Sequence, residues 1–510
     1  MTLSKFRRSD MSPQRLIMVV FGAVVALTAC TGAMGVQPGD AVIPPELSAP
    51  ELTVVVLAAD DLVQIESVVV ANESEVQPGP EGLPVLPWGG QPIDLAVTAP
   101  GFEPWEFTIE EYPEAGRIEF RLEPVVLRGV VTTDSGRPLP GTTVALGAAR
   151  DTTDNEGRYA LERAVPGVIE LSRPAWENID YPWDGEVSQV DMSMNPTIVH
   201  AVRVSPEDLL ESERWDTILS LADVTGINAV AIDLKTEDGS VVYPTEVPVA
   251  NAIGAVSGYF DAVEVVSEAK AHDLHTIARI GVFQDDFYAA AEPDRAVLSE
   301  DGSLWRSRNG FAWLDPSDPL AHDYSISLAE EACGRLGFDE VQFDYVSYPY
   351  GGDVTTAVFD GAYNQEVRVA SVASFLSRAY SVLHPMGCTV STTLLGIVLE
   401  STADEGVGQR PGTMSRIVDV LSPTLYSTNY GPGWKGFENP DNHAVEIVDT
   451  ALAGGRGKLD GHGYLRPWIQ TWTISNAEQR AVQSVVSENG MGWLLWSNST
   501  SYTADALPRP

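Results

Sequence analysis

The sequence predicts a multidomain protein: a C-terminal α/β barrel of the (β/α)₈, TIM type, preceded by two small all-β, sandwich-like modules. From about residue 196, apolar strands alternate with segments of helical period, which favours a parallel sheet with crossover helices. Before residue 196, short runs alternate apolar and polar residues and are separated by Gly, Pro and Asp turns. The 510 residues suffice for several domains.

The N-terminus carries a targeting signal. A basic region precedes an apolar run at 16–27, which is short for a bilayer crossing and typical of a signal-peptide core. The run ends in Leu27-Thr28-Ala29-Cys30, which resembles the lipobox of bacterial lipoproteins and implies lipidation of Cys30. We therefore expect an exported, extracytoplasmic protein anchored to a bacterial cell membrane by lipid. A plain secretory signal is the alternative interpretation.

Five segments follow from these patterns: a signal peptide (1–30), a flexible tether (31–50), a β-sandwich-like module (51–123), a second module (124–195) and the barrel (196–510). In the second module, the turn Gly136-Arg137-Pro138-Leu139-Pro140-Gly141 precedes Thr152-Thr153-Asp154-Asn155-Glu156-Gly157-Arg158-Tyr159. This pattern resembles the carboxypeptidase regulatory-like β-sandwich family, which implies a spacer or binding module. The acidic turn is interpreted as solvated, with Ca²⁺ binding as the alternative.

The net charge and the cysteine content limit the classes of ligand and partner that the protein can be expected to bind. The formal net charge is −41, from 72 acidic and 31 basic residues, and this field disfavours nucleic acid and anionic lipid headgroups. No Cys or His spacing predicts a zinc site, and we predict no cofactor. Cys333 and Cys388 are expected to be separately buried thiols, with a disulfide as the alternative in an oxidising compartment.

Eight strand segments build the predicted barrel. They lie at 198–204, 229–234, 276–282, 340–345, 389–395, 420–426, 465–471 and 492–496. Helical segments are predicted between them at 260–271, 324–336, 367–383, 444–452 and 477–487. Eight strands are the count of a closed barrel, whereas a doubly wound sheet would place a Gly-rich turn after the first strand.

Polar and aromatic residues gather where these strands end, which is the active face of such barrels. Period two places Glu340, Gln342 and Asp344 on one face of a strand, with Asp344 nearest its C-terminal end. The other candidates at strand ends are Asp233, Arg279, Tyr345, Tyr426, Asn429, Arg466, Trp468, Gln470 and Trp496. Aromatic rings stack on sugar C–H faces, so this mixture indicates a carbohydrate site. Mutual ion pairing of Asp233, Arg279 and Asp344 is the structural alternative.

Residues 198–503 resemble a known family, the "putative glycosyl hydrolase domain" of bacterial exported proteins. The matching stretches are 226–235, 277–280, 337–346, 466–470 and 492–496. The resemblance implies a TIM-type barrel related to glycoside hydrolases. Two positions depart from the family: Thr393 stands where it typically has an Asp, and Thr471 follows Gln470 where an acid is often seen.

Glycosidic hydrolysis usually needs two carboxylates. We predict Asp344 as nucleophile or base and Asp233 as its partner, with Asp285, Glu237 and Glu400 in reserve. Substrate-binding roles are predicted for Arg279, Gln342, Tyr345, Tyr426, Asn429, Arg466, Trp468, Gln470 and Trp496.

Three functions fit this sequence. The first is a glycoside hydrolase acting on a cell-surface or environmental polysaccharide. The second is a non-catalytic carbohydrate-binding or envelope-structural lipoprotein, a reading motivated by Thr393. The third is a deacetylase or other metal hydrolase, disfavoured because the seven His residues are scattered and His272 and His275 are expected on the far face.

Overall fold

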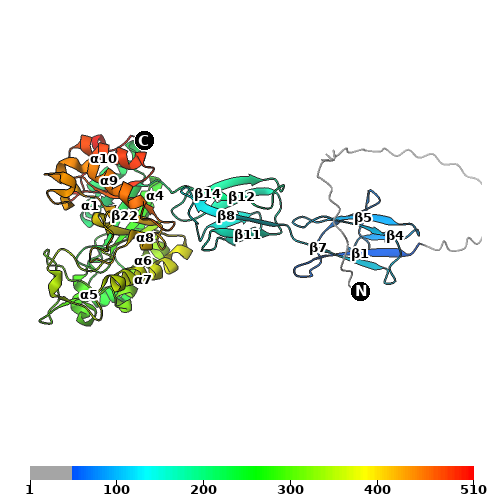
Figure 1. Cartoon of the computed structure of the whole chain (residues 1–510), viewed down its shortest axis with the longest axis horizontal. Helices are drawn as coiled ribbons and strands as arrows, with labels where there is room; N and C mark the ends of the chain where they lie inside the picture. The colour runs from blue at the N-terminus through cyan, green and yellow to red at the C-terminus, as the bar shows by residue number, and fades with distance from the viewer. Residues whose placement is uncertain (1–48, 510) are drawn as a thin grey trace, which may run out of the picture.

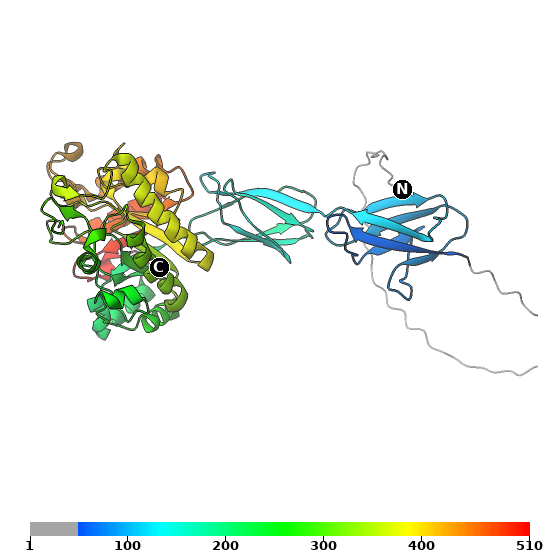
Figure 2. The ribbon, with the colours of Figure 1, turned by 90° about the horizontal axis from the view of Figure 1, so that it is seen from below.

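The computed structural model describes residues 49–509, so the predicted signal peptide and tether, Cys30 included, lie outside the described residues. Two all-β modules and a larger α/β body follow one another in a row (Figure 1). The row persists when the molecule is turned by 90° (Figure 2). The α/β body holds the C-terminus.

The first module contains two sheets around one apolar cluster that includes Val54, Leu95 and Phe120. Period-two burial along β5, in which Ile93, Leu95 and Val97 are buried, reflects the alternation of side chains across a strand. One sheet has the order β4-β1-β7 and the other β3-β2-β5-β6. Their strands are β1 (Glu51–Ala58), β2 (Val68–Ala71), β3 (Ser74–Glu75), β4 (Val85–Pro87), β5 (Ile93–Thr98), β6 (Trp105–Ile109) and β7 (Arg117–Leu122).

The second module also has two sheets, ordered β10-β9-β12-β13 and β11-β8-β14, with Leu127, Val144 and Trp183 in its core. Gly157, at a φ of 75°, closes the Asp154 turn, where an added Cβ would lie 2.3 Å from the Val131 carbonyl oxygen. The strands are β8 (Val126–Thr133), β9 (Thr143–Leu146), β10 (Ala149–Thr152), β11 (Arg158–Glu162), β12 (Gly167–Ser172), β13 (Ile179–Trp183) and β14 (Met192–Met194).

The α/β body is a closed barrel of eight parallel strand positions, as predicted. Pairing of β21 with β22 joins the two ends of the order β21-β19-β17-β16-β15-β25-β24-β22. The strands are β15 (His200–Val204), β16 (Ala229–Lys235), β17 (His275–Gly281), β19 (Glu340–Asp344), β21 (Thr389–Leu395), β22 (Val420–Thr424), β23 (Tyr464–Leu465) with β24 (Trp468–Gln470), and β25 (Trp493–Trp496). Pro467 separates β23 from β24 because it has no amide hydrogen to donate.

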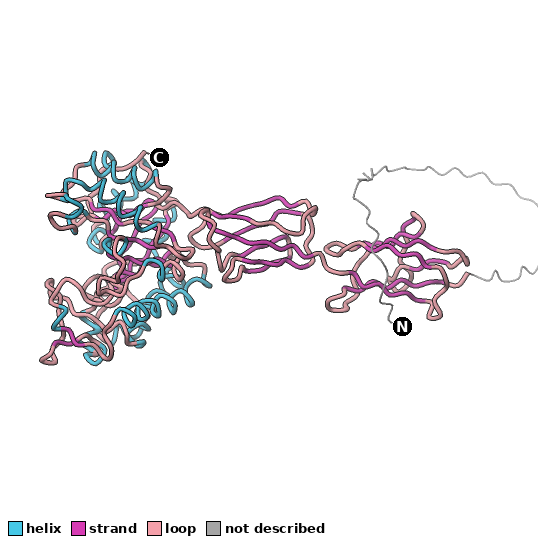
Figure 3. The backbone as a smooth tube through the Cα atoms, in the orientation of Figure 1, coloured by secondary structure: helices cyan, strands magenta, loops and turns pink. Residues whose placement is uncertain are grey.

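Helices surround these strands, whereas the two modules contain strands and loops (Figure 3). The α-helices are α1 (Pro206–Leu210), α2 (Ser212–Val224), α3 (Pro248–Ala252), α4 (Ala262–Ala271), α5 (Asp286–Ala291), α6 (Pro319–Glu331), α7 (Gln365–Leu383), α8 (Pro411–Met414), α9 (Ala444–Arg456) and α10 (Asn476–Glu488). Two short strands, β18 (Leu298–Ser299) and β20 (Ala357–Val358), pair outside the barrel. The sequence did not predict α2, which contributes the buried Trp215 and Ile218.

Side chains alternate between the barrel interior and the helical layer. On β16, Val230 and Ile232 join the large cluster that the helices cover, whereas Ala229 and Ala231 join a small cluster inside the barrel. The same alternation sends Asp233 inward. The barrel interior therefore holds polar side chains at the level of Asp233, and these side chains form the candidate site.

The second module is attached to the end of the barrel where the strands begin. Arg173 is fully buried there and its Nη1 lies 2.8 Å from Oδ1 of Asp419, the residue before β22. The same guanidinium donates to the Tyr380 hydroxyl at 2.9 Å and to the Pro140 carbonyl at 2.9 Å. Tyr464 packs edge-on against Trp176. The barrel thus points its C-terminal strand ends away from both modules.

Cys333 and Cys388 form a disulfide, so the expectation of separate thiols is wrong. A π-helical turn, Ala332–Leu336, continues α6 and brings Cys333 to Cys388, the residue before β21 and 55 residues away in sequence. Within residues 49–509, none of the helices combines the length and apolar composition that a bilayer crossing requires.

Candidate active site

Asp344 is the carboxylate at the C-terminal end of β19, and its side chain is 15% exposed. Arg279 donates from Nε at 2.8 Å and from Nη2 at 2.5 Å to Oδ2. The Tyr345 amide donates to Oδ1 at 2.8 Å, and the Thr393 hydroxyl donates to the same oxygen. Charge-assisted bonds of this kind hold a carboxyl group in one orientation.

Tyr345 has a φ of 54°, an unusual conformation for a bulky residue. Such a backbone costs about 1–3 kcal/mol and persists where the surroundings enforce it. The Tyr345 amide donates to the carboxyl group of the preceding residue, and the Tyr345 ring packs edge-on against Trp313. Local strain is therefore stored beside Asp344.

Asp233 is completely buried and both of its oxygens are bound. Arg279 Nη1 lies 2.9 Å from Oδ1, while Arg203 on β15 approaches Oδ2 from Nη2 at 2.6 Å and from Nε at 3.0 Å. Burial alone would raise the pKa of Asp233, but the Arg203 and Arg279 guanidinium groups lower it below its ordinary value. Asp233 therefore remains ionised and acts as an anchor for both arginines.

Glu237 follows β16 and is the more accessible neighbour of this network, with its side chain 27% exposed. Its Oε1 lies 3.9 Å from Arg279 Nη2, the atom that also contacts Asp344. Arg279 thus touches three carboxylates, of which Asp344 and Glu237 retain access to solvent.

Aromatic rings line the same end of the barrel. Trp496, the last residue of β25, stacks under Arg203 and Arg279, whose guanidinium carbons lie 4.0 and 4.6 Å from the ring centroid. Tyr426 is half-buried and packs edge-on against Trp472. Flat apolar faces beside charged oxygens can bind a sugar ring and its hydroxyls together.

The family model described as "Putative glycosyl hydrolase domain" matches residues 201–502, which is more than half of the chain and all of the barrel strands except His200. The chain belongs to this glycosyl hydrolase family. The predicted resemblance of the C-terminal region is thereby confirmed. A comparison with curated proteins finds no match.

Solved structures also resemble the chain. A hypothetical protein from Ruminiclostridium thermocellum is 30% identical, with 38% of this chain and 96% of that chain covered and a TM-score of 0.34. The PgaB (BpsB) glycoside hydrolase domain from Bordetella bronchiseptica is 13% identical, with 60% and 95% covered and a TM-score of 0.45. The β-amylase catalytic domain from Paenibacillus polymyxa is 11% identical, with 61% and 96% covered and a TM-score of 0.39.

The glycosyl hydrolase domain brings together four of the predicted site residues at the mouth of the barrel: Asp344, Asp233, Arg279 and Trp496. Tyr345 and Tyr426 border them, and Asn429 is exposed on the short helix Ser427–Asn429. Arg279 is 1% exposed and saturated by carboxylates, so it contacts Asp344 and not the solvent. The proposed substrate contacts of these residues remain predictions.

Two predicted binding residues lie deeper, and a third, Gln470, is buried at the level of Trp496, with which it pairs in register. Gln342 and Trp468 are buried in the middle of the barrel, where the Trp468 indole donates to Gln342 Oε1 at 2.9 Å. Gln470 is 1% exposed, and its amide donates to the Trp472 carbonyl at 2.9 Å and to Thr473 Oγ1 at 2.9 Å. Gln342 and Trp468 therefore satisfy each other below the mouth, whereas Gln470 holds the loop that follows β24.

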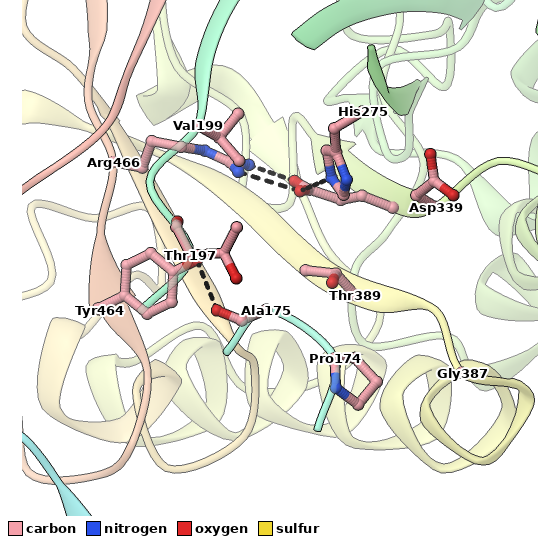
Figure 4. A pocket seen from close by; sticks show the side chains of 11 residues that line it. Pro174, Ala175, Thr197, Val199, His275, Asp339, Gly387, Thr389, Tyr464 and Arg466 are labelled. Atoms are coloured by element: carbon pink, nitrogen blue, oxygen red, sulfur yellow. Dashed lines mark hydrogen bonds and ion pairs between the residues drawn. The ribbon is translucent and has the colours of Figure 1, made fainter. Parts of the chain in front are cut away.

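Arg466 lies at the opposite end of the barrel from where the sequence places it. The chain enters this strand at Tyr464, so Arg466 comes before the break at Pro467 and faces Glu340, the first residue of β19. His275 Nε2 lies 3.1 Å from Glu340 Oε2. Figure 4 shows Arg466 and His275 at a pocket that Pro174 and Ala175 of the second module and Thr197 of the following connection also line. The volume of this cavity is about 210 Å³. A role for Arg466 in binding substrate at the mouth is therefore not supported.

Glu340 gives this lower cluster a pH dependence. Burial would raise its pKa, but Arg466 and His275 lower the pKa to about 2. The stabilisation of the folded state by the Glu340 carboxylate is complete above its ordinary pKa of 4.5 and is lost as the pH falls towards 2. We expect the free energy of unfolding to fall between pH 4.5 and 2 by on the order of 3 kcal/mol more in the wild type than in Glu340→Gln. Urea unfolding of both proteins across this range checks it, and parallel curves would contradict it.

Sequence reasoning missed two groups. Arg203 holds Asp233 from β15, and its inward position follows from the period-two pattern of that strand. Thr393 was noted for the acid it replaces, but its hydroxyl binds Asp344 directly. Among residues 49–509, no group of three or more His, Cys, Asp or Glu side chains is arranged to hold a metal ion.

Proposed function

We propose that the barrel hydrolyses glycosidic bonds in a cell-surface or environmental polysaccharide, with Asp344 as the attacking carboxylate or base. The observation that carries the proposal is the geometry of Asp344: a partly exposed carboxyl group at the C-terminal end of a barrel strand, fixed by Arg279, Thr393 and the Tyr345 amide. Family membership and the aromatic residues around the mouth support a carbohydrate substrate.

The test compares purified full-length protein with Asp344→Asn on a panel of bacterial and plant glycans, measuring reducing ends and binding. We expect kcat to fall roughly 10²–10⁴-fold while glycan binding persists, because the isosteric amide lacks the reactive charge. Asp449→Asn, an exposed carboxylate on α9, is the matched control and should keep full activity. Far-UV circular dichroism checks the fold. Full activity in Asp344→Asn would remove Asp344 from the mechanism.

A second candidate function is non-catalytic carbohydrate binding or an envelope-structural role. It is favoured by Thr393, which fills the position of the family's strand-five acid and occupies one oxygen of Asp344. The same glycan panel separates the two, since glycan binding without any product over a long incubation supports this candidate.

We also propose that the protein is exported and held at a bacterial membrane by lipid on Cys30, with the two all-β modules as spacers. The support is the lipobox-like sequence, and for the second module the resemblance to carboxypeptidase regulatory-like β-sandwiches. Cys30→Ala, expressed in a bacterium, should leave the membrane fraction; unchanged membrane association would contradict lipid anchoring at Cys30.

A further inference from the structure

The proposed chemistry needs a second carboxyl group that can carry a proton, and Asp233 does not meet this need. Both of its oxygens accept hydrogen bonds from arginines, and its side chain has no contact with solvent. An acid that donates a proton must be protonated part of the time and must reach the leaving oxygen. Near Asp344, Glu237 combines a carboxyl group with solvent access.

Glu237 is held in a rigid turn. Asp238 accepts hydrogen bonds from the Thr236 hydroxyl at 2.7 Å and from the Ser240 amide at 2.9 Å, which closes the turn around it. The Gln284 side chain donates to the Glu237 carbonyl at 2.8 Å. Gly239, at a φ of 91°, lies so close to Asp285 that an added Cβ would meet its Oδ1 at 2.2 Å. The backbone of Glu237 is therefore fixed on both sides.

The shared arginine limits the distance between the two carboxylates. Arg279 Nη2 lies 2.5 Å from Asp344 Oδ2 and 3.9 Å from Glu237 Oε1. These two oxygens therefore cannot be farther apart than the sum, 6.4 Å. Retaining glycosidases hold their carboxyl groups about 5–5.5 Å apart, whereas inverting enzymes need about 6.5–9.5 Å to admit a water. A limit of 6.4 Å between these two oxygens admits the retaining separation, and the shared contact with one guanidinium favours the shorter of the two arrangements.

We propose that Glu237 is the acid and base that partners Asp344, and that the barrel cleaves its glycoside with retention of anomeric configuration. This proposal rests on the proposed function. Arg279 acts as a positioning residue, because it holds Asp344 and aligns Glu237 while remaining buried.

The reaction has two balanced steps. In the first, an oxygen of Asp344 forms a bond to the anomeric carbon, the bond to the leaving oxygen breaks with its electron pair, and Glu237 gives that oxygen a proton. In the second, the Glu237 carboxylate takes a proton from water, the water oxygen bonds to the anomeric carbon, and the ester bond to Asp344 breaks. Both carboxyl groups return to their initial states.

The experiment uses the full-length protein and two kinds of probe: a panel of 2,4-dinitrophenyl glycosides and the glycans of the Asp344 test. Glu237→Gln should lose roughly 10²–10⁴-fold in kcat on glycans. It should still release a burst of dinitrophenolate, because this leaving group needs no proton. Azide should restore turnover and give a glycosyl azide of the substrate's configuration. The matched control is Glu246→Gln, a 78% exposed carboxylate in the segment between β16 and α3, with wild-type behaviour expected on both probes.

Proton NMR of the first-formed product gives an independent readout. Retention in the wild type, together with the dinitrophenolate burst and azide rescue of Glu237→Gln, supports the proposal. An inverted first product, or glycan hydrolysis by Glu237→Gln at the rate of Glu246→Gln, overturns it and leaves the proposed function standing. Failure of the wild type to hydrolyse any glycan or aryl glycoside overturns the proposed function itself.

Discussion

Arg279→Met is expected to lower the free energy of unfolding by about 3–5 kcal/mol at neutral pH and to abolish hydrolysis. Arg279 is 1% exposed and neutralises Asp233 and Asp344 together. Its removal leaves buried charge without a partner, and that penalty exceeds what the ion pair itself contributes. Urea unfolding followed by circular dichroism measures the stability, and the glycan assay measures the activity.

Two variants show whether the loss belongs to the network. Arg306→Met removes a 46% exposed partner of Asp286 and should cost under about 1 kcal/mol. Adding Asp344→Asn to Arg279→Met should recover part of the stability, because Asp344 loses its arginine partner in the single variant whereas Asp233 keeps Arg203. A loss below about 1 kcal/mol in Arg279→Met would show that the network is solvated and does not support the site.

Arg173→Met should cost a similar amount, about 3–5 kcal/mol, at the junction of the second module and the barrel. Its guanidinium is fully buried against Asp419 and also binds Tyr380 and Pro140. His384 and His462 pack around the same carboxylate, and burial lowers the pKa of both, so they remain neutral and cannot replace the arginine. Hydrogen exchange should rise in the residues that begin β21 and β22.

The control for this variant is Arg163→Met at the junction between the two all-β modules. Arg163 is 41% exposed, and its Nη2 lies 2.9 Å from Asp60 and 2.5 Å from Asp61. Exposed pairs contribute little, so we expect a change below about 1 kcal/mol. Equal losses in the two variants would contradict the distinction between a buried and an exposed junction.

The barrel could be predicted because each strand is an apolar run long enough to be recognised without its neighbours, and because few topologies are compatible with eight such runs. Contacts between segments that are far apart in the sequence could not be predicted. The pairing of Cys333 with Cys388 depends on the π-helical turn that contains Cys333. The position of Arg466 in the barrel depends on the side of Pro467 on which the strand begins. At the site, strand ends located Asp344, Arg279 and Asp233. The sequence did not show that Arg203 and Arg279 together saturate Asp233, which directs attention to Glu237.

The two junctions have a mechanical consequence. A buried guanidinium with several partners resists rotation, whereas solvated ion pairs exchange readily with water. Bending of this elongated chain should therefore concentrate between β7 and β8, and the second module should turn with the barrel as a single lever. The barrel opening would then move along an arc about the junction between the two all-β modules, while its orientation relative to the second module stays constant. This motion would bring the barrel opening into contact with a larger volume of the surroundings while the opening keeps facing away from the modules.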